Sequence, residues 1–198
     1  IHDPGTGMSR LITTKASKAE ATQRMGRAGR LSEGWCFKYW SRAEEGQMPK
    51  YALAEIERAD LTTFALDLAQ WGTNEHDLAL LTQPNPATLE GARAVLKMLG
   101  ALDETERITD HGRALSRVPA HPRIAHMITS AGHNATLPAA LLSERDILQK
   151  SGQSDFTKRI QAIVDDDLNV PEPARNRIKS EAKRLTRFTG QNDPRYSV

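Results

Sequence analysis

The sequence has little cysteine, few aromatic residues and no long apolar run. Cys36 is the only cysteine among 198 residues, so an internal disulfide and a cysteine-rich zinc site are both excluded. A chain without disulfides fits a reducing, cytoplasmic setting. No stretch approaches the roughly 20 consecutive apolar residues that a membrane-spanning helix needs, so we expect no membrane partner.

A strong charge of one sign is also missing. The formal net charge is +2, so a nucleic-acid partner must be argued from local clusters. Hydrophobic residues make up 38% and charged residues 26%, as in globular domains, and with three Trp, three Tyr and four Phe the core must rely on leucine and alanine. The opening IHDPGTGMSR shows neither an initiator methionine nor a signal peptide, which indicates a piece of a longer protein.

The phosphate-binding loop of nucleotide hydrolases is absent as well. The pattern G-x-x-x-x-G-K-[ST] occurs nowhere, so the chain supplies neither a phosphate cradle nor a hydroxyl for Mg²⁺. The six histidines are scattered, and His121 and His126 have a spacing that does not place both on one helix face. We therefore expect no metal site and interpret His121 as a helix-start or packing residue.

Two segments of the first fifty residues are β-prone. WCFKYW, Trp35–Trp40, is the strongest strand candidate in the chain, and Leu11–Thr14 is a shorter one. The segment Ser41–Lys50 is polar and contains glycine and proline, which is typical of a linker. This part of the chain is therefore predicted to be a small α/β unit.

From Ala54 onward the periodicity becomes helical. Two apolar faces each end at a glycine, and Asn85-Pro86 predicts the start of the second helix. ALDETERITDHGRAL then predicts a short β-wing and a helix starting at Thr109 or Asp110, so this stretch is predicted to be a winged helix. The faces consist of Leu61, Phe64, Leu68 and Trp71 before Gly72, and of Leu89, Ala92, Leu96 and Leu99 before Gly100.

Helices continue after Pro119, and Pro171 and Pro173 open the last one. The fold class is therefore mainly α: a small α/β remnant over residues 1–50, a winged helix over 51–118 and a helical bundle over 119–198. The apolar faces of the bundle are Ile124, Met127, Ile128 and Ala131; Phe156, Ile160, Ile163 and Val164; and Ile178, Ala182 and Leu185.

The octapeptide QRMGRAGR, residues 23–30, is the most informative motif. Ser17 and Glu20 form a capping box, which predicts a helix from Lys18 to about Arg27 with its end at Gly29. Two arginines three apart at the end of a helix suit a polyphosphate, because guanidinium groups stay charged and donate two hydrogen bonds at once. On spacing alone, a solvated basic helix end explains the pattern equally well.

QRMGRAGR closely resembles motif VI of superfamily 2 helicases, in the QRxGRxGR form of the DEAH-box proteins. The preceding DPGTGMSRLITTKASKAEATQR, the following GWCFKYWS and the later AEIERADLTTFALDLAQWG are similar to successive segments of that family. LGALDETERITDHGRALSRVPAHPRIAHMI resembles the end of its winged helix and the start of its helicase-associated, or ratchet, domain. LLSERDIL resembles the bacterial HrpB branch. The resemblance covers nearly the whole chain, in the expected order.

The resemblance implies that residues 1–50 are the last part of a second RecA-like domain. Arg27 and Arg30 would then be catalytic arginine fingers, and Gln23 would bind the ATP phosphates or sense the attacking water beside them. ATP and Mg²⁺ would be held by the first RecA-like domain of the same polypeptide, which is absent here. We therefore expect this piece to bind neither ligand and to be inactive alone. Asp103-Glu104 lies in the predicted wing turn, where we expect no catalytic role.

The last predicted helix carries a basic stripe. Between Arg175 and Arg187 the sequence has six basic residues and one acidic residue, Glu181. The family resemblance implies that these cations would line a channel for RNA or another nucleic acid. An exposed basic face of a bundle helix explains the stripe as well, and Asp165–Asp167 just before it is interpreted as a solvated helix end. The nucleic-acid candidates are Arg175, Lys179, Lys183 and Arg187, with Arg177 and Arg184 beside them.

Two other classes of protein compete with a helicase piece. A non-catalytic winged-helix module that binds nucleic acid explains residues 54–118 but leaves QRMGRAGR unexplained. A protein-interaction scaffold predicts no salt-dependent affinity for RNA. The stretch TSAGHNATLPAAL looks more broken than in relatives, so we expect irregular packing there.

Overall fold

A computed structural model describes residues 2–3, 8–9, 13–144, 146–147, 155–167 and 169–189. Strands β1 (His2–Asp3) and β2 (Met8–Ser9) pair antiparallel, with His2 opposite Ser9. Everything else with regular structure in these ranges is helical. The helices are α1 (Lys18–Ala28), α2 (Arg42–Gln47), η1 (Glu55–Glu57), α3 (Thr62–Trp71), η2 (Glu75–Asp77), α4 (Pro86–Met98), α5 (Asp110–Ser116), α6 (Pro122–Ala131), η3 (Gly132–Ala135), α7 (Thr136–Ser143), α8 (Phe156–Val164), α9 (Glu172–Leu185) and η4 (Thr186–Phe188).

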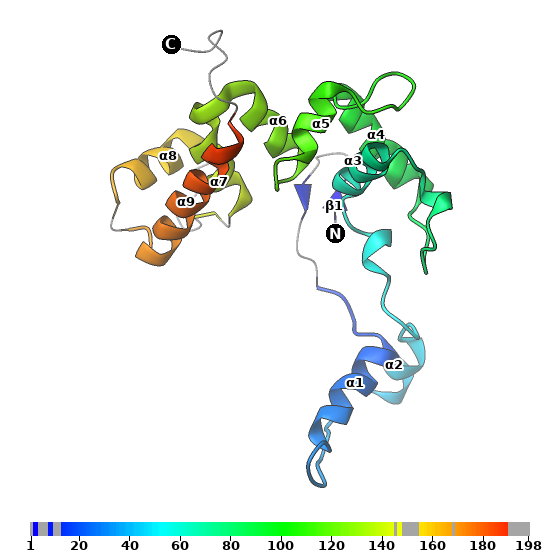
Figure 1. Ribbon diagram of the computed structural model, residues 1–198. Coiled ribbons are helices and arrows are strands. Elements are labelled where there is room, and N and C mark those ends of the chain that lie inside the picture. Colours follow the sequence, from blue (N-terminus) through cyan, green and yellow to red (C-terminus); the bar gives the residue numbers. More distant parts are fainter. Residues whose placement is uncertain are drawn as a thin grey trace.

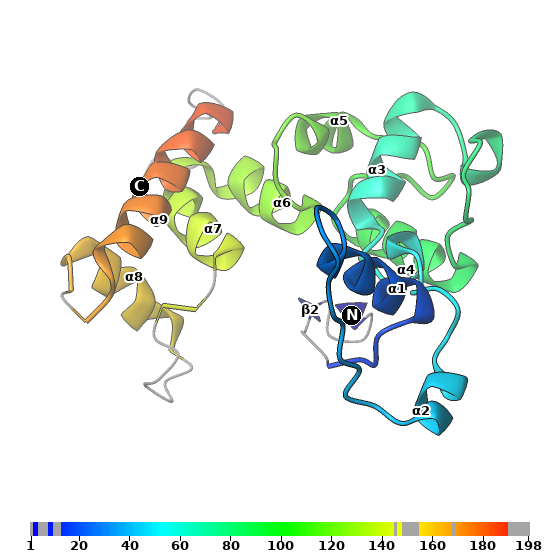
Figure 2. The same cartoon turned by 90° about the horizontal axis from the view of Figure 1, so that it is seen from below.

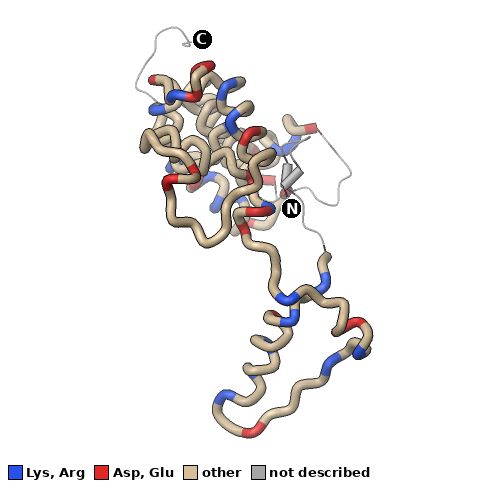
Figure 3. The backbone as a smooth tube through the Cα atoms, turned by 90° about the vertical axis from the view of Figure 1, so that its right-hand side faces the viewer, with Lys and Arg blue, Asp and Glu red and all other residues tan. Residues whose placement is uncertain are grey.

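The helices form an arm and two lobes. In Figure 1, α1 and α2 lie together below the rest of the molecule, and Figure 3 shows this arm from the side, extending away from the helical body. Helices α3, α4 and α5 make one lobe, and α7, α8 and α9 make the other, with α6 between them (Figure 2). The mainly helical architecture agrees with the fold class expected from the sequence.

The first lobe is a winged helix with a very short wing. Leu89 and Leu96 of α4 and Leu115 of α5 are fully buried, so hydrophobic burial holds the helices together. The wing is reduced to one antiparallel bridge between Leu102 and Ile108. Asp103 closes its turn by accepting hydrogen bonds from the backbone N–H groups of Thr105 and Arg107, so its carboxylate is a structural group.

The predicted helix boundaries in this lobe are confirmed. The Asn85 side chain caps α4 with Pro86 in its first turn, and the Thr109 hydroxyl caps α5. Gly72 and Gly100 follow α3 and α4 with φ of 70° at each. This left-handed conformation is one that glycine adopts without strain.

The second lobe packs α7 against α9 and α8, with Ile163, Ile178 and Leu185 fully buried between them. The helical faces predicted from Ile128, Ile178 and Leu185 are therefore correct. The break expected before Leu141 is also present, because the short helix η3 separates α6 from α7. Ala131 and Val164, which were assigned to buried faces, are instead exposed, since each is at the last turn of its helix.

Two predictions for the arm are wrong. Trp35–Trp40 forms no strand, and Trp35, Phe37 and Tyr39 are exposed; a strand requires a neighbouring strand to accept its backbone hydrogen bonds, and the described residues offer none there. The presumed linker Ser41–Lys50 contains helix α2, started by a second capping box between Ser41 and Glu44. Of the candidate strand at 11–14, residues 11 and 12 lie outside the described residues and 13–14 are not a strand.

Trp71 is a third correction. It was expected in the core, but 67% of its surface is exposed. It is the last residue of α3, one residue before the Gly72 stop, and the helix has no further turn to hold the indole against α4. The periodicity of Leu61, Phe64 and Leu68 identifies the correct face but not the residue at which that face leaves the core.

Candidate functional site

The helix that carries QRMGRAGR begins at a complete capping box. The Ser17 N–H donates to the Glu20 carboxylate at 2.7 Å, and the Glu20 N–H donates back to the Ser17 hydroxyl at 3.2 Å. These hydrogen bonds from the Ser17 backbone and hydroxyl hold the pKa of Glu20 below its usual value. Helix α1 then runs to Ala28 as predicted, with Gly29 after it.

The arm is held together by backbone hydrogen bonds more than by a core. The Lys18 and Ala19 N–H groups donate to the carbonyls of Pro49 and Lys50, at 2.9 and 3.1 Å. Those donors have no partner within the helix itself, so the chain after α2 completes the start of α1. No residue of α1 or α2 is buried, although Ser17 beside α1 is almost fully so.

A close approach shapes the turn after the octapeptide. A Cβ added to Gly34 would collide with the carbonyl of Ala28, the last residue of α1. Glycine at this position therefore allows the chain to turn back directly against the helix end. The turn leaves Arg30 beyond the helix, at the surface of the arm.

The three predicted phosphate-binding residues all lie at the surface. Gln23, Arg27 and Arg30 are exposed, and within the described ranges none of the three makes a hydrogen bond or ion pair with the protein. A Cβ added at Gly26 or Gly29 would meet nothing within 4 Å, so this side of the helix is open to a neighbouring surface. The two guanidinium groups thus remain free to bind an anion that another molecule or domain presents.

The basic stripe of α9 is partly neutralised. The Arg175 guanidinium is mostly buried and donates to the carbonyls of Asp166 and Asp167, at 2.7 and 2.5 Å. The Lys179 ammonium lies 2.6 Å from the Asp166 carboxylate and lowers its pKa. Asp166 is therefore a partner of the stripe, and the interpretation of this acidic run as merely solvated is wrong for it. Arg175 and Lys179 therefore hold the chain before α9 against this helix, and their charges are partly neutralised.

The other four cations of the stripe, three on α9 and Arg187 on η4, divide into two pairs. Arg177 and Arg184 lie near carboxylates, Glu144 at 3.6 Å and Glu181 at 2.6 Å. Lys183 and Arg187 are exposed, and in the part of the chain that the structure describes they have neither a hydrogen-bond partner nor an ion-pair partner. Contact of these candidates with nucleic acid stays a prediction.

Two histidine contacts join the winged helix to the next helix. The His121 side chain caps α6 by accepting the Arg123 N–H, so its other nitrogen carries the proton and donates to Asp60 at 3.0 Å. Burial alone would raise the pKa of Asp60, but hydrogen bonds from His121 and Thr62 hold it well below its usual range. The helix-start role of His121 is confirmed. No local pattern in the sequence predicts its contact with Asp60, because the two residues are far apart in the chain.

The second contact is a histidine pair. His111 Nε2 on α5 lies 2.8 Å from His126 Nδ1 on α6, and the rings meet edge to face. Burial and the neighbouring His126 lower the pKa of His111. The described residues contain no group of three or more His, Cys, Asp or Glu side chains that could hold a metal.

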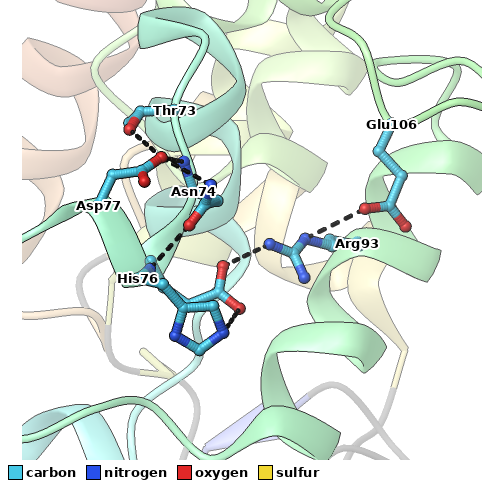
Figure 4. A network of polar contacts seen from close by, with 7 residues as sticks. Thr73, Asn74, His76, Asp77, Arg93 and Glu106 are labelled. Atoms are coloured by element: carbon cyan, nitrogen blue, oxygen red, sulfur yellow. Dashed lines mark hydrogen bonds and ion pairs between the residues drawn. The ribbon is translucent and has the colours of Figure 1, made fainter.

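A polar network fixes the wing against α4. Arg93 lies between Glu75 of η2, at 2.6 Å, and Glu106 of the wing, at 3.5 Å (Figure 4). In the same view, Asp77 accepts hydrogen bonds from Thr73 and Asn74 and holds the turn before η2. These contacts hold η2 and the wing in place against α4.

Known proteins show clear similarity to this chain. The family model described as the winged-helix part of the helicase-associated domain HA2 matches residues 92–120. The ATP-dependent RNA helicase HrpB of Escherichia coli is 36% identical over 160 residues, which are 78% of this chain and 19% of that protein. A DExH-box ATP-dependent RNA helicase of Arabidopsis thaliana is 33% identical over 131 residues, 64% of this chain and 8% of its own length. A crystal structure of E. coli HrpB superposes with a TM-score of 0.79 at 30% identity, covering 96% of this chain and 23% of that one.

The mainly helical fold, the octapeptide at the end of α1 and these similarities define the class of protein: the chain belongs to the DEAH-box helicase family. Within the family it corresponds to a piece of the HrpB type. It spans only 19% of the length of the E. coli protein that it matches. In the part of the chain that the structure describes, no helix is long and apolar enough to cross a membrane.

Proposed function

We propose that this chain is the part of an ATP-dependent RNA helicase that supplies the arginine fingers and the modules beside the nucleic-acid channel. The observation that supports this most directly is the pair Arg27 and Arg30, exposed and unpaired at the end of a capped helix. Residues 1–50 would be the end of the second RecA-like domain, 51–118 the winged helix and 119–198 the ratchet domain. We place the parent protein in the cytoplasm, since its single cysteine here, Cys36, needs no oxidising compartment.

In the parent, the first RecA-like domain would hold ATP and Mg²⁺, and this chain would close over the γ-phosphate. Arg27 and Arg30 would donate to the phosphoryl oxygens, on which negative charge spreads during transfer, and Gln23 would hydrogen-bond to the nucleotide or the attacking water. The fit rests on chemistry: guanidinium groups remain protonated and the side of α1 that carries them is open. Opening after hydrolysis would move the winged helix and ratchet domain along the strand.

The test compares the chain with its parent-length protein. The purified chain is expected to hydrolyse no ATP with or without RNA, because it has no phosphate-binding loop. In the parent-length protein, Arg27→Ala is expected to lower kcat by about 10³-fold or more, with ATP binding changed far less. Arg24 is an exposed arginine of the same helix to which we assign no phosphate role, so Arg24→Ala is the matched control and should retain most activity.

Two results would refute the proposal. One is RNA-stimulated ATPase activity of the purified chain that Arg27→Ala abolishes. The other is an Arg27→Ala parent-length protein with unchanged kcat. The alternative, a non-catalytic winged-helix module, predicts no ATPase activity in the parent-length protein with or without Arg27→Ala.

A further inference from the structure

A cavity of about 660 Å³ opens at the surface of the second lobe, where α8 and α9 meet the start of α7. Its walls also include residues of η3 and η4, and we call it the α8–α9 groove. Figure 1 shows α7, α8 and α9 side by side in this lobe, remote from the arm that carries QRMGRAGR. The groove is therefore a site separate from the proposed arginine fingers.

The floor of the groove is aliphatic. Leu137, Ile163, Val164 and Ala182 line it, and Val164 keeps 59% of its surface exposed. A valine left open beside other apolar side chains, in a hollow, favours an apolar occupant, because covering it removes this surface from water.

One wall of the groove is a row of cations. Lys179 and Lys183 lie four residues apart on α9, about 6 Å along one side of the helix, and Arg187 follows four residues later in η4. Asp166 neutralises Lys179, which leaves Lys183 and Arg187 as the free positive charges. No Asp or Glu side chain is among the residues that line the groove, so the charged side chains of its lining are cations.

We propose that the α8–α9 groove binds an acidic amphipathic helix of a partner protein. An aliphatic floor beside two cations four residues apart is complementary to a helix with leucines on one face and glutamates four residues apart along its edge. A single nucleic-acid strand would also meet the cations, but the residues that line the groove include no Phe, Tyr or Trp on which a base could stack, and His133 is the one aromatic side chain among them. The chemistry of the floor therefore favours a peptide over a strand.

The test uses the full chain and a fluorescein-labelled helical peptide with a leucine face and glutamates four residues apart. Fluorescence anisotropy should show saturable binding. Lys183→Glu with Arg187→Glu should weaken it by about tenfold, or about 1.4 kcal/mol. A peptide with lysines in place of the glutamates should then bind the double variant better than the unchanged chain, and Val164→Asp should weaken both peptides.

The matched control is Arg177→Glu with Arg184→Glu, which changes the net charge of the chain equally but at side chains outside the groove. It should leave the affinity within about twofold, since these two side chains do not line the groove and solvent screens surface charges. Thermal melting of each variant separates lost binding from lost folding. Absent binding, or equal loss in both double variants, would overturn the proposal. So would a twelve-nucleotide single strand that binds more tightly than the peptide and is lost in the same groove variants.

Discussion

The His111–His126 pair limits how much charge the joint between α5 and α6 can carry. One ring nitrogen must donate and the other must accept across the 2.8 Å contact, so at least one imidazole stays neutral. Burial and His126 lower the pKa of His111 in the folded protein below its usual value. The unfolded chain therefore takes up this proton first as the pH falls, and the pair stabilises the fold above about pH 6.5 but less below it.

Replacing His111 tests this pH dependence. Between pH 7.5 and 5.5 the free energy of unfolding should fall for the unchanged chain, and His111→Gln should reduce that fall by about 0.5 kcal/mol, a small amount because solvent screens a half-exposed group. Urea unfolding at both pH values measures it. His133→Gln, which changes an exposed histidine, is the control and should leave the pH dependence unchanged. Equal dependence in the unchanged chain and His111→Gln would contradict the account.

At the level of elements, the capping box decides whether α1 forms. The helix has no buried residue, so packing adds little to its stability, and the hydrogen bonds of Ser17 and Glu20 must supply much of it. Ser17→Ala should cost about 1 kcal/mol of helix stability and fray the turn before Gln23. Hydrogen exchange at the α1 amides should become faster. Ser41→Ala should instead affect α2 and leave α1 unchanged; equal exchange of α1 in both variants would show that the cap is unimportant.

Two glycines in the winged helix should respond in opposite directions to alanine. A Cβ at Gly112 would collide with the carbonyl of Ala101 and come within 2.7 Å of Ile108, so Gly112→Ala should push α5 from the wing and cost about 1–3 kcal/mol. Gly91 lies in the middle of α4 with nothing within 4 Å, so Gly91→Ala should stabilise the chain by about 0.5–1 kcal/mol. Thermal unfolding of both variants checks the signs. A melting temperature for Gly112→Ala equal to or above that of Gly91→Ala would rule this account out.

Local signals in the sequence account for most of these elements. Capping side chains and glycine stops lie within a few residues of the helix ends that they set, and α1, α4 and α5 begin where they indicate. Ser41 and Glu44 form the same capping-box pattern and predict the start of α2. The glycine and proline of that segment favoured a linker instead, and that prediction was wrong. Contacts between distant segments, such as Asp60 with His121, have no counterpart in local sequence and could not be predicted.

At the scale of the whole molecule, the candidate phosphate-binding residues and the β-prone segment WCFKYW both lack partners within the described residues. Motif similarity predicts Gln23, Arg27 and Arg30 as site residues, and the structure adds that they are exposed and have no partner among the described residues. The β-prone WCFKYW forms no strand, because β propensity is only a preference and a neighbouring strand must supply the hydrogen bonds. In the sequence, Trp35, Phe37 and Tyr39 alternate with Cys36 and Lys38, and all three aromatic side chains are exposed here. In a strand this spacing would place the three aromatic side chains on one face, which a sheet could then bury.

That alternation gives a prediction for the whole molecule. In this chain Trp35 is 86% exposed, so Trp35→Ser should change the free energy of unfolding by less than about 0.5 kcal/mol. In a parent-length protein with a complete second RecA-like domain, the same change should cost about 3 kcal/mol, because the indole would be buried against the sheet. Urea unfolding of both proteins with and without the substitution measures the difference, and Leu81→Ser, another fully exposed apolar residue, serves as a control outside the arm. An equally small effect of Trp35→Ser in both proteins would mean that WCFKYW joins no sheet in either.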